Sequence, residues 1–513
     1  MRKGLGYSVN HVIYNCYLAQ FEPKKVKEAL KDKNWVEPIH QELHQFVRND
    51  VLELVLRPKD THVIDTKWIF KNKTNEDGEV VRSKSRLVAQ GCTQVEGVDF
   101  DESFAPIARL ESIRILLFIA CIMKFKLYQM DVKSAFLNRI LNEEMFIPKG
   151  FQDPHFLDHV LRLKKALYGL KQAPRAWYDR LTTYLLDHGF KKGQADRTLF
   201  VKRDEKSLIV AQVYVDDIVF GSTIDHLAQE FSEEMKNEFE MSMVGELNYF
   251  LGLQVKQRKD GIFISQEKYA KNLIKKFDLD SKKHASTPMS SLAKLSLDPA
   301  NVEVDPALYR SMIGNLLYLT VSRPNITFSV GVCAQFQAAP KESHLTVIQR
   351  IIRYVNGIFD YGIWNSKEDS NKCLAGYSDA DWAECIDDRK STSSDCFYLD
   401  NNLVSWISKK QNLVSLSMAE AEYIIAGSCY MQLLPMKKLL HDYGITQDTM
   451  CVLCDNTSAI NLSKNPVQYS KSKHIEIRYH FIRDLVEDKI VWLEFINTDN
   501  QKVDVFTKPL DGP

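Results

Sequence analysis

Two adjacent aspartates interrupt an apolar stretch near the middle of the chain, and this feature constrains the fold most. Alternating and β-branched apolar residues at 207–215 and 218–220 predict two strands of a tight hairpin with Asp216 and Asp217 at its turn. Like charges this close repel, and strands usually avoid Asp. A hard cation such as Mg²⁺, which takes oxygen ligands, would cancel the repulsion. The alternative interpretation is a solvated Asp-Asp turn.

Composition sets the general class of the protein. A chain of 513 residues predicts about three or four domains. Lys+Arg and Asp+Glu both number 67, so any contact with a polyanion must come from local patches. Ten scattered cysteines fit a reducing compartment. Cys451 and Cys454 alone have CxxC spacing, and we expect the interior of a buried strand there rather than a zinc site or redox pair.

Hydrophobic patterning predicts the order of elements. The longest apolar run, 115–123, is too short to span a bilayer, and with no secretory signal at the start we expect a soluble protein in which this run forms a core helix. The other expected elements are a helix whose core stripe is Trp35, Ile39, Leu43 and Phe46, two strands within 63–90 around a turn at 75–78, a strand at 125–132, a helix at 174–188, a linker near 283–310, a mainly helical stretch at 307–358 and a last module at 371–511.

A third aspartate completes a possible metal centre. Asp131 closes the strand expected at 125–132, and a lone Asp at a strand end is usually a turn former. Together with the Asp-Asp hairpin, however, it gives three carboxylates that can hold two Mg²⁺ ions. Paired metals about 3.5–4 Å apart serve in-line phosphoryl displacement.

Several motifs resemble the reverse transcriptase of copia-type LTR retrotransposon Pol polyproteins, in order and from about residue 20 to the end. The motifs are Lys67-Trp68-Ile69-Phe70-Lys71, Ser85-Arg86-Leu87-Val88-Ala89-Gln90-Gly91, Gln129-Met130-Asp131-Val132-Lys133-Ser134-Ala135-Phe136-Leu137-Asn138, Leu167-Tyr168-Gly169-Leu170-Lys171-Gln172-Ala173-Pro174-Arg175, Tyr214-Val215-Asp216-Asp217 and Tyr249-Phe250-Leu251-Gly252. The resemblance implies an RNA-directed DNA polymerase with Mg²⁺ as cofactor, Mn²⁺ being an alternative.

The resemblance also implies residue roles. Asp131, Asp216 and Asp217 would be the catalytic metal ligands. The remaining roles are nucleotide binding by Arg86, Phe136, Tyr168, Gly169, Tyr214 and Val215, and primer binding by Phe250, Leu251 and Gly252. Phe136 would lie under the incoming sugar and favour dNTPs, although a core Phe has the same sequence pattern. Arg86 would reach the triphosphate, since a planar guanidinium suits phosphate oxygens.

A second set of carboxylates near the C-terminal end resembles the RNase H of the same family. Asp379 and Asp455 each end an expected strand, Glu422 lies in an expected helix, and Asp504 follows later. The resemblance implies that these four hold a second pair of Mg²⁺ ions that serve hydrolysis of the RNA in a hybrid. Glu420 is the competing choice, since two residues two apart on a helix face different ways. Asp381 is expected at the surface, and the basic run 470–474 either holds the hybrid backbone or is simply solvated.

The implied fold class is a multidomain α+β and α/β protein. A palm-type (right-hand) polymerase with fingers, palm and thumb would be followed by an RNase H-like mixed sheet with flanking helices. The expected domains are an N-terminal extension and start of the fingers (1–60), fingers and palm (61–245), thumb and connection (246–370) and an RNase H-like domain (371–513).

The implied partners are an RNA template, a DNA primer, RNA–DNA hybrid, dNTPs and neighbouring Pol parts such as integrase, with no membrane. The implied location is a cytoplasmic virus-like particle whose DNA product is destined for the nucleus. No nucleocapsid knuckle, protease motif or integrase zinc motif is present, so we expect the C-terminal part of a Pol polyprotein or a truncated gene.

Some positions depart from the family pattern. The segment 144–150 is shortened, Arg139 and Glu384 stand where Gly is usual, and Ser394-Asp395 replaces an expected Gly-rich turn. Pro435 falls inside the helix of Glu422, where proline costs about 3 kcal/mol. Two alternative functions follow: a degenerate or co-opted copy that binds nucleic acid without catalysis, and a nuclease without polymerase activity.

Overall fold

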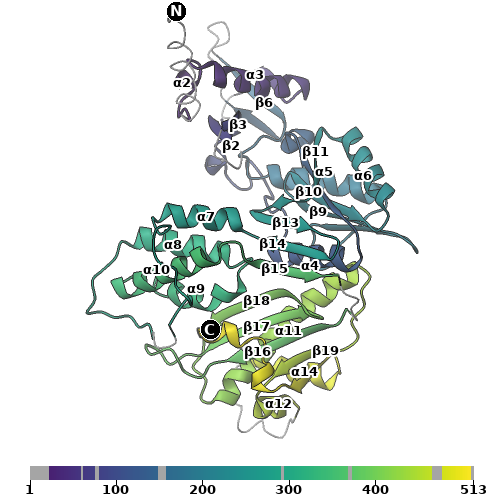
Figure 1. Ribbon diagram of the computed structural model, residues 1–513. Coiled ribbons are helices and arrows are strands. Elements are labelled where there is room, and N and C mark those ends of the chain that lie inside the picture. Colours follow the sequence, from purple (N-terminus) through teal and green to yellow (C-terminus); the bar gives the residue numbers. More distant parts are fainter. Residues whose placement is uncertain are drawn as a thin grey trace, which may run out of the picture.

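The computed structural model describes residues 22–58, 62–74, 80–147, 158–290, 294–367, 372–464 and 477–509. The described strands form five sheets, and helices cover their faces (Figure 1). The mixed α/β content that the sequence implies is confirmed. None of the described helices is both long and apolar enough to cross a membrane.

The N-terminal region combines helices with two small sheets, at the top of Figure 1. Its elements are α2 (Val26–Ala29), α3 (Lys33–Arg48), β1 (Leu52–Leu56), β2 (Thr66–Thr74), β3 (Val80–Ala89), β5 (Ile140–Ile147) and β6 (His159–Lys165). The predicted stripe on α3 is confirmed, because Trp35, Ile39 and Phe46 are buried and Leu43 packs against them. β2 and β3 pair antiparallel, as predicted; their predicted turn at 75–78 lies outside the described residues.

The six-stranded sheet at the centre of the molecule, called the central sheet below, has the order β11-β4-β10-β9-β8-β7. Its strands are β4 (Leu127–Val132), β7 (Lys191–Lys192), β8 (Leu199–Arg203), β9 (Leu208–Tyr214), β10 (Asp217–Ser222) and β11 (Met241–Glu246), with helices α4 (Leu110–Ile122), α5 (Ala173–Asp187) and α6 (Asp225–Glu238). Ala211 and Val213 pack with α5 and α6, whereas Val210 and Val219 pack with α4. This alternation along the strands places the central sheet between two helical layers.

A smaller sheet and a helical group follow. The strands are β12 (Tyr249–Phe250), β13 (Leu253–Gln257), β14 (Gly261–Ser265) and β15 (Gly362–Ser366), and the helices are α7 (Glu267–Lys276), α8 (Pro306–Leu319), α9 (Thr327–Ala334) and α10 (Glu342–Gly357). The predicted helical stretch is confirmed. The described residues between α7 and α8 contain no helix or strand, which agrees with the predicted linker.

The C-terminal sheet is mixed, with the order β18-β17-β16-β19-β20. Its elements are β16 (Leu374–Ala380), β17 (Thr392–Leu399), β18 (Asn402–Lys410), α11 (Met418–Asp442), β19 (Met450–Cys454), α12 (Thr457–Lys464), α14 (Ile477–Glu487) and β20 (Val491–Phe495). β16 runs antiparallel to β17 and parallel to β19. Parallel β16 and β19 therefore bring their carboxyl ends to the same edge.

In this region the structure contradicts one expectation and confirms another. The turn expected at Ser394-Asp395 is wrong: both residues lie inside β17, and the Ser394 hydroxyl donates to the Phe506 carbonyl. α11 continues through Pro435, as the pattern predicted. Met431 and Pro435 are exposed, and on the solvent side of a helix water can replace the missing donor.

The central and C-terminal sheets share one hydrophobic cluster that runs through α4. Arg114 of α4 is buried and stacks on Trp406 of β18 with its guanidinium carbon 4.2 Å from the ring centre. Its Nε donates to the Val404 carbonyl at 3.0 Å and its Nη1 to the Val321 carbonyl at 3.0 Å. Asp442 at the end of α11 accepts from the Gln194 amide at 2.9 Å. These contacts fix the two sheets against each other.

Candidate active sites and relatives

The predicted Asp-Asp hairpin exists, and its turn is tight. Tyr214 of β9 pairs directly with Asp217 of β10, so Val215 and Asp216 form the turn. Val215 has φ 55°, an unfavourable value for a β-branched residue. The Trp177 indole donates to the Val215 carbonyl at 2.7 Å, and the Val132 amide donates to the Asp216 carbonyl at 2.9 Å. Helix α5 and strand β4 thus hold the strained turn.

Strand pairing brings Asp131 to this turn. Asp131 of β4 and Asp217 of β10 are direct partners across adjacent antiparallel strands, where Cβ atoms lie about 4.5–5.5 Å apart. Burial, and then the charge of Asp216, raises the pKa of Asp131. Burial also raises the pKa of Asp217, although Gln129 opposes this by donating to Oδ1 at 2.9 Å. Three oxygen-donor carboxylates, none ion-paired with a basic side chain of the described residues, fit a hard divalent cation.

The predicted nucleotide-binding residues form a second group beside this centre. The Arg86 guanidinium carbon lies 4.0 Å from the Tyr168 ring centre, and Nη2 donates to the Tyr168 hydroxyl at 3.2 Å. The rings of Phe136 and Tyr168 have centroids 4.5 Å apart. Gly169 has φ 94°, and a Cβ there would lie 2.1 Å from the Ala89 carbonyl oxygen. The structure thus brings together Arg86, Phe136, Tyr168 and Gly169.

Two lysines near this group were missed by the sequence reasoning. The charges of Lys84 and Lys73 act on Asp131, as does that of Arg86, and lower its pKa against the effect of burial. Burial lowers the pKa of Lys84 itself. Lys84 and Arg86 are two apart in a strand and share a face, so the strand prediction could have identified Lys84.

The predicted primer-binding residues lie at the turn between β12 and β13. Leu251 and Gly252 both have positive φ, 50° and 77°, as a type I′ hairpin turn requires. The Tyr318 hydroxyl of α8 donates to the Leu251 carbonyl at 2.6 Å. Phe250 is buried, and its ring lies 6.1 Å from that of Tyr214 in an edge-on contact. This contact links the turn to the Asp-Asp hairpin.

The second predicted centre collects four carboxylates from four elements. Asp379 lies in β16, Glu422 in α11, Asp455 directly after β19, and Asp504 in a short 3-10 turn. Glu422 is 2 % exposed and Asp379 6 %. Burial, and then the charge of Asp379, raises the pKa of Glu422 to about 9. Burial, with repulsion from Asp504 and Asp455, raises the pKa of Asp379 despite a short hydrogen bond from Thr507.

The donor set of this second centre also fits divalent metal ions. Oxygen Oδ1 of Asp504 is buried and has no hydrogen-bond partner within the described part of the chain, while Oδ2 accepts from Lys508 at 3.0 Å. Asp455 accepts from the Thr498 hydroxyl at 2.9 Å. An unpartnered oxygen beside repelling carboxylates is what a cation would satisfy.

Local hydrogen bonds separate the two glutamates of α11. Glu422 accepts from the Ala380 amide at 3.0 Å and faces Asp379. Glu420 accepts from the Leu416 amide at 2.8 Å, while its own amide donates to the Ser417 hydroxyl at 3.2 Å. Glu420 therefore helps to cap the helix. Ser417 and Glu420 match the Ser-x-x-Glu capping box, a signal that sequence reasoning could have used.

One neighbouring expectation is wrong. Asp381 was expected at the surface, yet it is 9 % exposed and accepts from the Thr392 amide at 2.8 Å. Burial raises its pKa to about 6. Asp381 follows β16 directly, and this hydrogen bond to the start of β17 draws it inward. The basic run at 470–474 lies outside the described residues.

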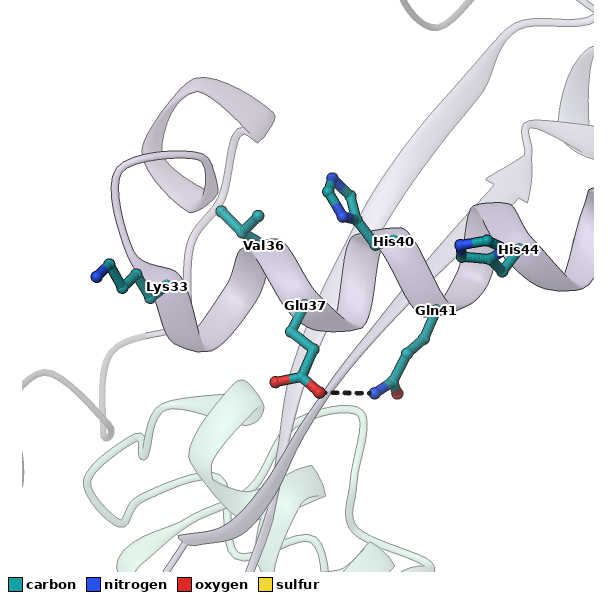
Figure 2. A pocket seen from close by; sticks show the side chains of 6 residues that line it. All are labelled: Lys33, Val36, Glu37, His40, Gln41 and His44. Atoms are coloured by element: carbon teal, nitrogen blue, oxygen red, sulfur yellow. Dashed lines mark hydrogen bonds between the residues drawn. The ribbon is translucent and has the colours of Figure 1, made fainter.

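A shallow hollow of about 360 Å³ lies elsewhere, along the exposed side of α3 (Figure 2). It is lined by Lys33, Val36, Glu37, His40, Gln41 and His44. None of the predicted site residues lines it.

Comparisons with known proteins show which proteins this chain resembles. The reverse transcriptase (RNA-dependent DNA polymerase) family matches residues 49–291. The chain is 38 % identical over 497 residues to the retrovirus-related Pol polyprotein from transposon RE1 of Arabidopsis thaliana, covering 96 % of this chain and 34 % of that protein. It is 35 % identical over 502 residues to the one from transposon TNT 1-94 of Nicotiana tabacum, covering 95 % of this chain and 38 % of that protein.

A solved structure is similar in fold. The foamy viral protease-reverse transcriptase, in complex with double-stranded DNA, aligns with a TM-score of 0.50 at 12 % identity, over 91 % of this chain and 70 % of that one. The present chain spans about a third of the length of the Pol relatives it matches. On these matches, the chain belongs to the copia-type LTR retrotransposon Pol polyprotein family and carries its reverse transcriptase region.

Proposed function

We propose that this chain is an RNA-directed DNA polymerase with a second, RNase H active site. The observation that carries the polymerase is the direct cross-strand pairing of Asp131 with Asp217, which places both beside Asp216 and its strained turn. Asp131, Asp216 and Asp217 would bind Mg²⁺. Bound Mg²⁺ would activate the primer 3′-hydroxyl and neutralise the triphosphate.

The chain's own residues would orient the substrates. Arg86, held over the Tyr168 ring, would bind triphosphate oxygens, with Lys84 and Lys73 adding positive charge near the same centre. Phe136 would stand against the sugar and disfavour a 2′-hydroxyl; at 7 % exposure most of its ring is already packed. Tyr214, Val215 and Gly169 would complete the nucleotide pocket.

The primer end would rest on the turn at Leu251-Gly252. This turn is anchored by Tyr318 and by the contact of Phe250 with Tyr214. A primer held there would therefore have a fixed position relative to the Asp-Asp hairpin. The partners in this proposal are an RNA template, a DNA primer and dNTPs. The location is the virus-like particle of the element, with integrase as a polyprotein neighbour.

For the second activity, Asp379, Glu422, Asp455 and Asp504 would hold Mg²⁺ and hydrolyse the RNA strand of a hybrid. Support comes from their convergence from four elements, with Glu422 rather than Glu420 facing Asp379. The palm, fingers, thumb and RNase H assignments and the domain limits at 60, 245 and 370 belong to the same proposal.

Incorporation of dTTP on a poly-rA template with an oligo-dT primer and Mg²⁺ tests the polymerase. We expect incorporation by the unmodified chain and its loss in Asp216→Asn. Asp187→Asn, at the exposed end of α5, is the matched control and should be unchanged. No incorporation by the unmodified chain, or undiminished incorporation by Asp216→Asn, would overturn the polymerase.

Cleavage of the RNA in an RNA–DNA hybrid tests the nuclease separately. We expect loss in Asp455→Asn and no change in Asp448→Asn, an exposed Asp just before the same strand β19. Cleavage that persists in Asp455→Asn would contradict the assignment of this centre.

A further inference from the structure

The second carboxylate centre contains a sulfur atom that its proposed chemistry does not use. Cys454 is the last residue of β19 and is fully buried. Its Sγ lies 3.7 Å from Oε2 of Glu422. Glu422, Cys454 and Asp455 each offer one ligand atom, and these three atoms lie within 4.8 Å of one another. Among the described residues, no other three His, Cys, Asp or Glu side chains come together in this way.

The charges around this group favour a bound cation. The charged groups that act on the pKa of Glu422 are Asp379 and Asp455, and both are negative. Lys508 is ion-paired with Asp504. Glu422 is a buried carboxylate among other carboxylates. Its donors are the Ala380 amide and the Cys454 thiol, and neither supplies the positive charge that a bound cation would.

The CxxC spacing does not add a second sulfur. Residues three apart in a strand point to opposite faces of the sheet, and the Cys451 Sγ accordingly lies beside another carboxylate, 3.6 Å from Oε2 of Glu494. The donor set is therefore one sulfur and two carboxylates. Mg²⁺ accepts oxygen ligands alone, whereas Zn²⁺ and Cd²⁺ bind thiolate strongly.

The spacing suits a small tetrahedral ion. Zinc–oxygen and zinc–sulfur bonds of about 2.0–2.3 Å place the ligand atoms about 3.3–3.8 Å apart. Three donors already within 4.8 Å reach that spacing by small side-chain shifts. Asp455 is only partly buried, so the group has a path to solvent.

We propose that Glu422, Cys454 and Asp455 form a site for a thiophilic divalent cation, of which Zn²⁺ is the physiological example. On binding, the Cys454 thiol gives its proton to water as the sulfur–metal bond forms. Because Glu422 and Asp455 are shared with the proposed Mg²⁺ centre, Zn²⁺ occupancy excludes Mg²⁺ and stops RNA cleavage. This last consequence rests on the proposed nuclease function; the binding itself does not.

Cadmium is the probe, because a cadmium–thiolate bond gives an ultraviolet charge-transfer band that carboxylates do not. The parent is the full chain with Cys16 and the exposed Cys92 and Cys373 changed to Ser, which lowers the background. Titration with Cd²⁺ should give a saturable band in the parent that is lost in Cys454→Ser. The matched control, Cys451→Ser, removes the other buried thiol of β19 and should keep the band.

Two further measurements secure the assignment. Asp455→Asn removes a ligand from the partly exposed side of the site; we expect the band to persist with Cd²⁺ binding weakened by about tenfold, equivalent to the loss of about 1.4 kcal/mol. Circular dichroism identifies any variant that fails to fold. A parent without a saturable band, or a band undiminished in folded Cys454→Ser, overturns the site.

Inhibition distinguishes this inference from the proposed function. We expect the Zn²⁺ concentration that halves RNA cleavage to rise about tenfold or more in Cys454→Ser, each variant being normalised to its own rate in Mg²⁺. A band without RNA cleavage in any variant would leave the site standing and refute the nuclease. Cleavage in Mg²⁺ without a band would refute the site and leave the nuclease standing.

Discussion

Both carboxylate centres bring negative charges close together, but the two centres differ in their surroundings. In the central sheet, Asp131, Asp216 and Asp217 are half-buried, and the positive charges of Lys84 and Arg86 lie near them. In the C-terminal sheet, Asp379 and Glu422 are almost fully buried, and burial raises the pKa of Glu422 to about 9. A bound cation would therefore stabilise the deeper centre more, because fewer basic side chains and less water offset its charge.

Charge removal should separate the two centres completely. Asp216→Asn should lower dTTP incorporation about a thousandfold, since a metal-binding carboxylate supports several kcal/mol of transition-state stabilisation. The rate of RNA cleavage by the same variant should change by no more than about twofold, well below the tenfold change that corresponds to about 1.36 kcal/mol in the activation free energy. Asp455→Asn should show the reverse. An equal fall of both activities in one folded variant would mean that the centres are not independent.

Arg114 should couple the stability of the two regions. Arg114→Met leaves the carbonyls of Val404 and Val321 without their donor and should destabilise the protein by about 2–5 kcal/mol. Urea unfolding measures the loss of stability. In Arg114→Met we expect the central and C-terminal sheets to unfold in separate transitions. The control Arg109→Met, at an exposed position just before α4, should change stability by less than about 0.5 kcal/mol. Equal effects of the two substitutions would remove Arg114 from this role.

Asp395 should make the C-terminal region sensitive to pH. It is 2 % exposed, its Oδ1 has no hydrogen-bond partner within the described residues, and burial raises its pKa to about 7. The folded state then binds a proton that the unfolded state releases near pH 4, so the contribution of Asp395 to stability should fall as pH rises from about 4 to about 7 and then level off.

Removing the carboxyl group of Asp395 tests this pH dependence. Asp395→Asn should flatten the slope and stabilise the protein at pH 8 by a few kcal/mol. Denaturant unfolding at pH 5 and pH 8 measures the difference, and the exposed Asp448→Asn is the control. A slope that is the same in both variants would show that Asp395 is charged in the folded protein at neutral pH.

The nucleotide side of the central region should be sensitive to backbone crowding. Gly169→Ala combines a positive φ with a Cβ 2.1 Å from the Ala89 carbonyl oxygen, so it should destabilise the protein by about 1–3 kcal/mol and raise the KM for dTTP as Tyr168 shifts. Gly97→Ala has a similar φ, 78°, but no atom within 4 Å of the new Cβ. This control should cost about 1 kcal/mol and leave KM unchanged. Equal KM values in the two variants would exclude a positioning role for Gly169.

Sequence reasoning succeeded where the signal is local. The alternation around the Asp-Asp pair predicted β9 and β10, the apolar run predicted α4, and helical spacing predicted the buried stripe of α3. It failed at Asp381 and Asp395, which were expected at the surface and in a turn. Asp381 is held by the Thr392 amide, and Asp395 lies in β17 between β16 and β18. Period and composition do not encode these contacts between strands. The choice between Glu420 and Glu422 was open, although the capping box at Ser417 offered a local answer.

By itself, the sequence determined the strands, the helices and the carboxylates that end them, because backbone propensity and hydrophobic period are properties of neighbouring residues. Tertiary structure alone decided which of these carboxylates meet. Asp131 faces Asp217 through long-range strand pairing. Glu422 faces Asp379 because α11 packs on β16, and Cys454 turns toward them because of its face in β19. Such contacts depend on register and burial across distant segments, and these are fixed only when the sheets close around their shared core.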